Sequence, residues 1–167
     1  MKRFFLSTLI LLISLSVFSQ IDNSERNTDF KVNLVHPFLG GGEISIEQSI
    51  SQKSGVGISL AFFNRDVNSG AHWVTSRMGF KEKFFAIQPY YRKYFGKKKT
   101  RGFLIELNSG IFIDDRALVG AGLAFGNKHV FKKGFIMEYY VGAGKTNESG
   151  FFEQGWYVRV GFNIGIR

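Results

Sequence analysis

Cysteine is absent from this 167-residue chain, and proline occurs only twice. The absence of cysteine excludes a lipoprotein anchor, a disulfide scaffold, and any site in which a thiolate binds a metal or acts as a nucleophile. Beyond the N-terminal region, no segment has the 3.6-residue periodicity of an amphipathic helix. By contrast, the chain contains 19 Phe, 6 Tyr and 20 Gly. Such a composition favours many strands over helices.

The first 19 residues have the order of regions that is typical of a secretory signal peptide. A basic start, residues 1–3, precedes an apolar stretch, residues 4–18, that only small hydroxyl residues interrupt, and Ser19 follows. We expect residues 1–19 to be a cleaved signal peptide and residues 20–167 to form one exported domain. An uncleaved anchor helix is the weaker alternative, because the apolar run is shorter than the ~20 residues that span a bilayer.

Basic residues outnumber acidic ones, and the formal net charge is +9. An excess of this size suits nucleic acid or an anionic surface. Behind a signal peptide we expect no nucleic-acid partner, and we predict membrane lipid and lipopolysaccharide as the anionic partners. The alternative is that the charges only keep exposed turns soluble.

From Phe30 onward the chain falls into eight segments in which apolar residues alternate with small or polar ones. Clusters of Gly, Lys, Asn and Asp separate these segments. Alternation with period two, interrupted by turn residues at this spacing, is typical of antiparallel hairpins. We predict an all-β fold, an eight-stranded antiparallel up-and-down transmembrane β-barrel. The predicted strands lie near 29–37, 42–51, 55–64, 84–95, 102–113, 118–126, 134–145 and 155–166.

Alternate residues of these segments form two chemically different faces. One face is apolar, with residues such as Val32, Ile58 and Leu107, whereas the other is rich in Gly and Ala and carries a few charges. Eight strands leave an interior that side chains only just fill, so small residues and opposite charges suit the lumen, and the apolar face then points outward. The charged residues that we assign to the lumen are Glu47, Arg92, Glu106, Glu138 and Arg159. We expect them to pair and close the lumen, without an open pore; an acid/base site is the alternative.

Aromatic residues fall near the predicted strand ends, as the aromatic girdles of membrane barrels do. If strands alternate in direction, they form two rims: Phe30, Tyr91, Phe103, Phe125 and Phe135 at one, and Phe62, Phe85 and Trp156 at the other. Short basic connections at 52–54, 96–101 and 127–133 share the first rim, and the longer ones at 65–83 and 146–154 share the second. This arrangement predicts periplasmic turns and external loops.

The long connection at 65–83 mixes apolar and cationic side chains. Its candidate binding residues are Arg65, Trp73, Arg77, Phe80, Lys81 and Lys83. Such a mixture suits lipopolysaccharide phosphates, a surface protein or a host partner, while the alternative is a loop that folds against its own barrel rim.

Three stretches carry a family resemblance: "PYYRKYF" at 89–95, "RGFLIEL" at 101–107, and "GAGLAFGNKHVFKKGFIMEYYVGAG" from Gly120. They resemble Bacteroidota outer-membrane β-barrels of unknown function, which are similar to the small eight-stranded barrels of the OmpA and OmpX type. The resemblance covers residues 30–167. It implies a bacterial outer-membrane location and carries no assigned activity.

No motif predicts catalysis, a cofactor or a metal. "GAGKT" at 142–146 lacks the first glycine of a phosphate-binding loop, and the three histidines, His36, His72 and His129, have few suitable neighbours. We therefore expect a non-enzymatic outer-membrane barrel that contributes to envelope structure or surface interaction. Two alternatives stay open: a soluble secreted lipocalin-like barrel that binds a small apolar ligand, with the faces reversed, and a lipid-modifying outer-membrane enzyme.

Overall fold

The computed structural model describes residues 27–64, 83–113, 117–147 and 155–167. These residues form eight strands and two short 3₁₀ helices: β1 Thr28–Asn33, η1 His36–Leu39, β2 Gly41–Ser51, β3 Ser54–Asn64, β4 Lys83–Tyr94, β5 Gly102–Ile113, β6 Ala117–Val130, η2 Lys132–Gly134, β7 Phe135–Thr146 and β8 Trp156–Ile166. Among the described residues, no helix is long and apolar enough to cross a membrane. The predicted signal peptide at 1–19 lies outside the described residues.

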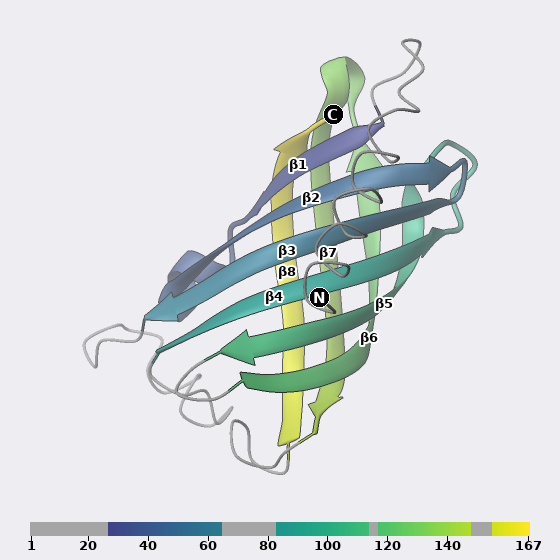
Figure 1. Ribbon diagram of the computed structural model, residues 1–167. Coiled ribbons are helices and arrows are strands. Elements are labelled where there is room, and N and C mark those ends of the chain that lie inside the picture. The colour runs from purple at the N-terminus through teal and green to yellow at the C-terminus, as the bar shows by residue number, and fades with distance from the viewer. Residues whose placement is uncertain (1–26, 65–82, 114–116, 148–154) are drawn as a thin grey trace, which may run out of the picture.

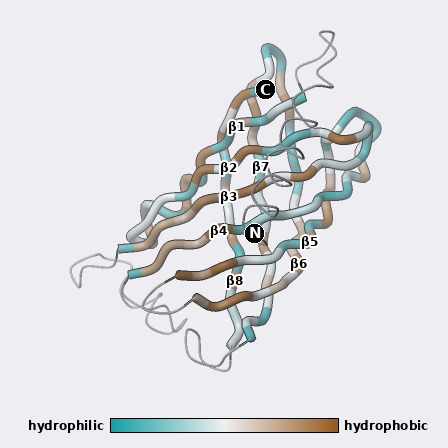
Figure 2. Tube along the Cα trace, viewed as in Figure 1, coloured by the Kyte–Doolittle hydropathy of each residue, from teal (hydrophilic) through white to brown (hydrophobic). Residues whose placement is uncertain are grey.

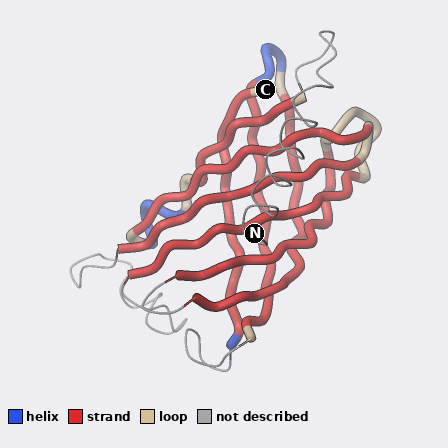
Figure 3. The backbone as a smooth tube through the Cα atoms, in the orientation of Figure 1, coloured by secondary structure: helices blue, strands red, loops and turns tan. Residues whose placement is uncertain are grey.

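The eight strands form one closed antiparallel barrel in the order of the chain, with β8 returning to β1. Figure 1 shows the strands wound around a common axis, with the connections gathered at the two ends. Figure 3 shows that nearly all of the described backbone is strand. The predicted all-β, eight-stranded up-and-down barrel is thereby confirmed.

Alternate side chains point to opposite sides of the barrel wall, because successive residues of a strand face opposite ways. The apolar face points outward along every strand, and Figure 2 shows the resulting alternation of hydrophobic and hydrophilic residues. Ile44, Leu107 and Val141, on three different strands, are 57%, 58% and 60% exposed. The inward face is buried and is mostly polar or small, with a few large apolar residues such as Phe84, Phe112 and Leu118 in a cluster. The face assignment predicted from the sequence is confirmed.

Two strand ends differ from the prediction. β1 ends at Asn33 rather than near residue 37, because the chain turns into η1, where Pro37 lies in the first turn. β6 continues to Val130 rather than 126, so the turn predicted at 127–133 shrinks to η2 and its neighbours. Phe125, predicted at a strand end, therefore lies well inside β6.

The barrel closes by a short seam between β1 and β8. These strands pair only from Phe30 with Ile166 to Asn33 with Asn163. Beyond this point one backbone hydrogen bond follows, from the Leu34 N–H to the Phe162 carbonyl at 2.8 Å. The Asn33 side chain adds two more: its amide donates to the Val160 carbonyl at 3.2 Å, and its oxygen accepts from the Phe162 N–H at 3.3 Å. A side chain thus satisfies backbone groups of β8 past the end of β1.

Candidate functional site

The five charged residues predicted for the lumen meet inside the barrel. The Arg92 guanidinium is at the centre, since it contacts Glu106 through Nε and Nη2 at 2.7 Å, Glu47 through Nη1 at 2.7 Å and Glu138 through Nη1 at 2.8 Å. Arg159 binds the other oxygen of Glu106 through Nε at 2.5 Å. All five side chains are buried, and Glu47, Glu106 and Glu138 have no exposed surface.

Further charged residues that the sequence analysis did not assign join this cluster. The Lys31 ammonium lies 2.7 Å from Glu47 and 3.1 Å from Glu138, and the Lys128 ammonium contacts Glu47 at 2.7 Å and also pairs with Asp29. Asp29 and Lys31 alternate with the outward Phe30 and Val32, so the alternation along the strand could have assigned both to the lumen. Lys128 could not be assigned in this way, because the predicted strand ended at residue 126.

Each of the eight strands contributes to one connected set of hydrogen bonds and ion pairs. We call this set the lumen network; its members, from β1 to β8 in order, are Lys31, Glu47, Ser59, Arg92, Glu106, Lys128, Glu138 and Arg159. Ser59 joins because Arg159 Nη2 donates to its hydroxyl at 3.3 Å. A network that includes every strand opposes slippage of any strand past its neighbours, which would separate its charges.

Every Asp and Glu side chain of the described residues lies in the lumen and has a cationic or polar partner. They are Asp29, Glu43, Glu47, Glu106 and Glu138. Asn163 and Asn108 donate to Glu138 Oε1 at 2.9 Å and to Glu106 Oε1 at 3.0 Å, which are oxygens that Lys31 and Arg159 also contact. Buried charges that are all paired are characteristic of a structural role, because a buried charge without a partner would strongly destabilise the folded protein.

Three lumen tyrosines fill the remaining space, and each lies over a glycine of the neighbouring strand. The direct cross-strand pairs are Tyr90 with Gly57, Tyr140 with Gly161, and Tyr157 with Gly144. At each glycine an added Cβ would overlap the tyrosine ring. The Arg92 guanidinium also stacks on Tyr90, 4.3 Å from the ring centroid. Rings and guanidinium groups together occupy the middle of the barrel.

Towards the end of the barrel near η1 lies an arrangement around Glu43, which Arg159 Nη1 joins to the lumen network at 3.7 Å. Its carboxylate lies 3.0 Å from His36 Nε2 and accepts hydrogen bonds from Asn33 at 2.8 Å and Tyr140 at 3.2 Å. Burial lowers the pKa of His36 below its usual 6.5, more strongly than the neighbouring Glu43 raises it. The imidazole also packs against the Phe63 ring, with the centroids 4.7 Å apart and the ring planes tilted by 48°.

A cavity of about 40 Å³ lies beside this His36–Glu43 pair. A histidine held by a carboxylate is the arrangement that activates a nucleophile in hydrolases. Among the described residues that line the cavity, however, none is Ser, Thr or Cys, and most are apolar. In the part of the chain that the structure describes, no three His, Asp or Glu side chains are placed to hold a metal ion. The pair is best explained as a polar contact that anchors η1 to β2.

The candidate binding residues of the long connection have mostly no described position. Lys83 is the first residue of β4, where it is exposed and pairs across the sheet with Asn64. Arg65, Trp73, Arg77, Phe80 and Lys81 lie outside the described residues.

No protein-family model, no curated protein and no solved structure matches this chain.

Proposed function

We propose that the chain is a non-enzymatic barrel of a bacterial outer membrane, related to the small barrels of Bacteroidota, with a closed lumen. Its role is to contribute to envelope structure or to interact with other molecules at the cell surface. The observation that carries this proposal is the combination of a continuous apolar exterior with a buried, fully paired charge network.

The exterior supports a lipid environment. Large apolar side chains project outward from all eight strands, and a soluble monomer rarely exposes an apolar surface of such extent. β2 to β8 contain 11 to 14 residues each. At about 3.3 Å per residue and a tilt of about 40°, such strands cover about 28–35 Å, which exceeds the apolar band of ~25 Å on membrane barrels.

The rims support the same proposal. Phe62 pairs directly with Phe85 at the end that carries the long connections, and Phe95 lies 5.9 Å from Phe103 at the end with the short turns. Phe131 and Phe135 form a second aromatic pair at this end, with ring centroids 5.8 Å apart. Aromatic side chains on both rims suit the two water interfaces of a bilayer.

The lumen supports the absence of a pore and of an apolar ligand. Arg92, Lys128 and Tyr94 have almost no exposed surface and occupy the interior between the strands. A lipocalin-like barrel would need the opposite arrangement, with an apolar interior open to a ligand and a polar exterior. The direction of the side chains therefore favours the membrane proposal over the soluble one.

Cell fractionation tests the location. We expect the full chain, expressed in a Gram-negative host, to sediment with outer membranes, to resist carbonate extraction, and to migrate faster in gels when unheated than when boiled. Recovery in buffer without detergent would support the soluble alternative instead.

Planar-bilayer recording tests the closed lumen. The purified protein is expected to give no large, steady conductance, because the lumen network fills the barrel. Steady pores in the wild-type protein would contradict this part of the proposal while leaving the membrane location intact.

A further inference from the structure

The charges of the barrel are distributed very unevenly between lumen and rim. All Asp and Glu side chains of the described residues lie in the lumen, whereas most Lys and Arg side chains of these residues lie elsewhere. A group of them gathers at the end with the short turns: Lys97, Lys98, Lys99, Arg101, Lys133 and Arg167. We call this group the basic rim. It comes from the β4–β5 turn, the β6–β7 turn and the end of β8, which meet only because the barrel closes.

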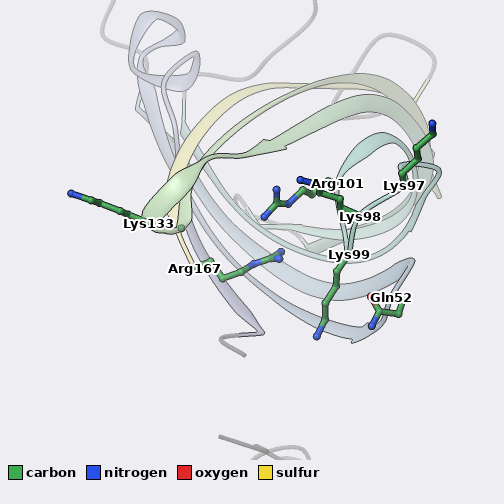
Figure 4. A pocket seen from close by; sticks show the side chains of 8 residues that line it. Gln52, Lys97, Lys98, Lys99, Arg101, Lys133 and Arg167 are labelled. Atoms are coloured by element: carbon green, nitrogen blue, oxygen red, sulfur yellow. The ribbon is translucent and has the colours of Figure 1, made fainter. Parts of the chain in front are cut away.

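The basic rim surrounds a depression of about 670 Å³ over the mouth of the lumen. Figure 4 shows that Arg101 and Arg167 extend over this depression from opposite sides, while Lys97 and Lys133 point away from it. The uncharged lining is small, since only Gln52 and Gly134 contribute it. A hollow of this size is large enough for a ligand with several charged groups.

One of these cations is fixed by the lumen. Arg167 donates to Asp29 through Nε at 2.7 Å and Nη2 at 3.1 Å, and Nη2 also donates to the Thr100 hydroxyl at 2.7 Å. Asp29 is already paired with Lys128, so it carries two cations on one carboxylate. Arg167 therefore keeps positive potential at the mouth even though it is hydrogen-bonded.

Four of the other cations, Lys97, Lys98, Arg101 and Lys133, form no ion pair with any residue that the structure describes. Like charges on neighbouring residues repel one another, and an anion would relieve that repulsion. Lys99 donates a hydrogen bond to the Asn27 side-chain oxygen at 2.7 Å.

We propose that the basic rim binds a ligand carrying more than one phosphate group, either a soluble oligophosphate or a phospholipid headgroup. A phosphate presents several strongly accepting oxygens, so one group can contact two or three cations at once. Arg101 supplies a planar fork suited to a phosphate, and the neighbouring lysines add point charges. The inference goes beyond the proposed function and does not depend on the location of the barrel.

Calorimetric titration of the full chain in lauryldimethylamine oxide, a detergent without phosphate, tests the proposal. Sodium tripolyphosphate is the soluble probe, and short-chain diphosphatidylglycerol is the headgroup probe. The test variant is Lys98→Gln with Arg101→Gln. The control is Lys53→Gln with Lys132→Gln, which removes the same charge at the same end of the barrel from residues that do not line the depression. None of the four substituted residues belongs to the lumen network, so both variants are expected to fold like the wild type. Circular dichroism checks this.

We expect at least one probe to bind, and the test variant to bind it at least about tenfold more weakly than the control variant. Loss confined to tripolyphosphate would identify a soluble ligand, and loss confined to the lipid would identify a headgroup. Absence of binding by both probes, or equal weakening in both variants, would overturn the proposal. Equally tight binding of citrate would overturn the assignment to phosphate.

Discussion

Arg92 pairs with more buried carboxylates than any other cation of the described residues. Its guanidinium contacts Glu47, Glu106 and Glu138, which come from three different strands. A guanidinium has five donors in one plane and stays protonated, so it can join several carboxylates where a lysine would reach fewer. The barrel interior brings together carboxylates that would repel one another without this cation.

Replacement of Arg92 by methionine is expected to lower the free energy of unfolding by about 3–5 kcal/mol, because it leaves buried carboxylates without a partner. Urea titration of the refolded protein in phospholipid vesicles measures the change. The matched control is Lys93→Met, at the next residue of β4, whose side chain is exposed on the outside. If the two variants lose the same stability, Arg92 does not organise the lumen.

His36 gives the fold a dependence on pH. Burial lowers its pKa in the folded protein, so between the unfolded value of about 6.5 and the lower folded value the unfolded chain binds more protons. Stability therefore falls as the pH drops through this window, by at most about 1.4 kcal/mol per pH unit from this group. His36→Gln is expected to reduce the slope of unfolding free energy between pH 7.5 and 5.5.

The matched control for His36 is His129→Gln, which removes an exposed imidazole from the outer side of β6. Chemical unfolding at a series of pH values compares the two variants with the wild type. A wild-type slope in His36→Gln would show that other groups produce the pH dependence.

At the scale of the strand, alternation predicted most of the architecture and failed at two ends. The outward face is apolar on every strand, and such a pattern can be recognised in the sequence alone. β1 ends where the chain turns into η1, and there the Asn33 side chain hydrogen-bonds to β8. The extension of β6 includes Lys128, whose partners Asp29 and Glu47 lie on β1 and β2. Alternation does not specify a turn or a contact with a distant strand, so it gave neither end.

The glycine–tyrosine pairs predict a specific cost of adding one methyl group. Gly161→Ala is expected to destabilise the barrel by about 1–3 kcal/mol, because the new Cβ would overlap the Tyr140 ring on β7. A double-mutant cycle in vesicles measures the coupling. In a Tyr140→Leu background, which removes the ring, the cost of Gly161→Ala is expected to fall well below its wild-type value. If Gly161→Ala destabilises the Tyr140→Leu variant as much as it does the wild type, the Tyr140 ring is not the cause of the destabilisation.

At the scale of the whole molecule, the sequence could predict the residues of the lumen but not their partners. Strand parity places Glu47, Arg92 and Glu138 on one face, yet they are far apart in the sequence and come from β2, β4 and β7. Their contacts depend on closure of the barrel and on the stagger between strands, which alternation does not specify. The sequence placed the short basic connections at one rim, but the depression that they form with Arg167 depends on the closed barrel.

If the exterior spans a bilayer, the cost of placing a lysine on it should depend on the depth of the substituted residue in the membrane. Leu107→Lys, near the middle of β5, is expected to cost about 2–4 kcal/mol in vesicles, while Phe95→Lys, beyond the end of β4, costs about 0–1 kcal/mol. The two positions are equally exposed, at 58% and 57%, so exposure alone cannot explain a difference. Equal costs for the two substitutions, measured by urea unfolding, would contradict a membrane-spanning exterior.

The short seam between β1 and β8 has a consequence for the order of assembly. It joins the two ends of the described chain, so its closure confines the longest loop, and it offers fewer backbone hydrogen bonds than the long β7–β8 ladder in return. Ion pairs make up part of the difference, because Arg167 reaches Asp29 and Lys31 reaches Glu138 across this line. We therefore expect this seam to close last during folding, with these ion pairs holding β1 against β7 and β8.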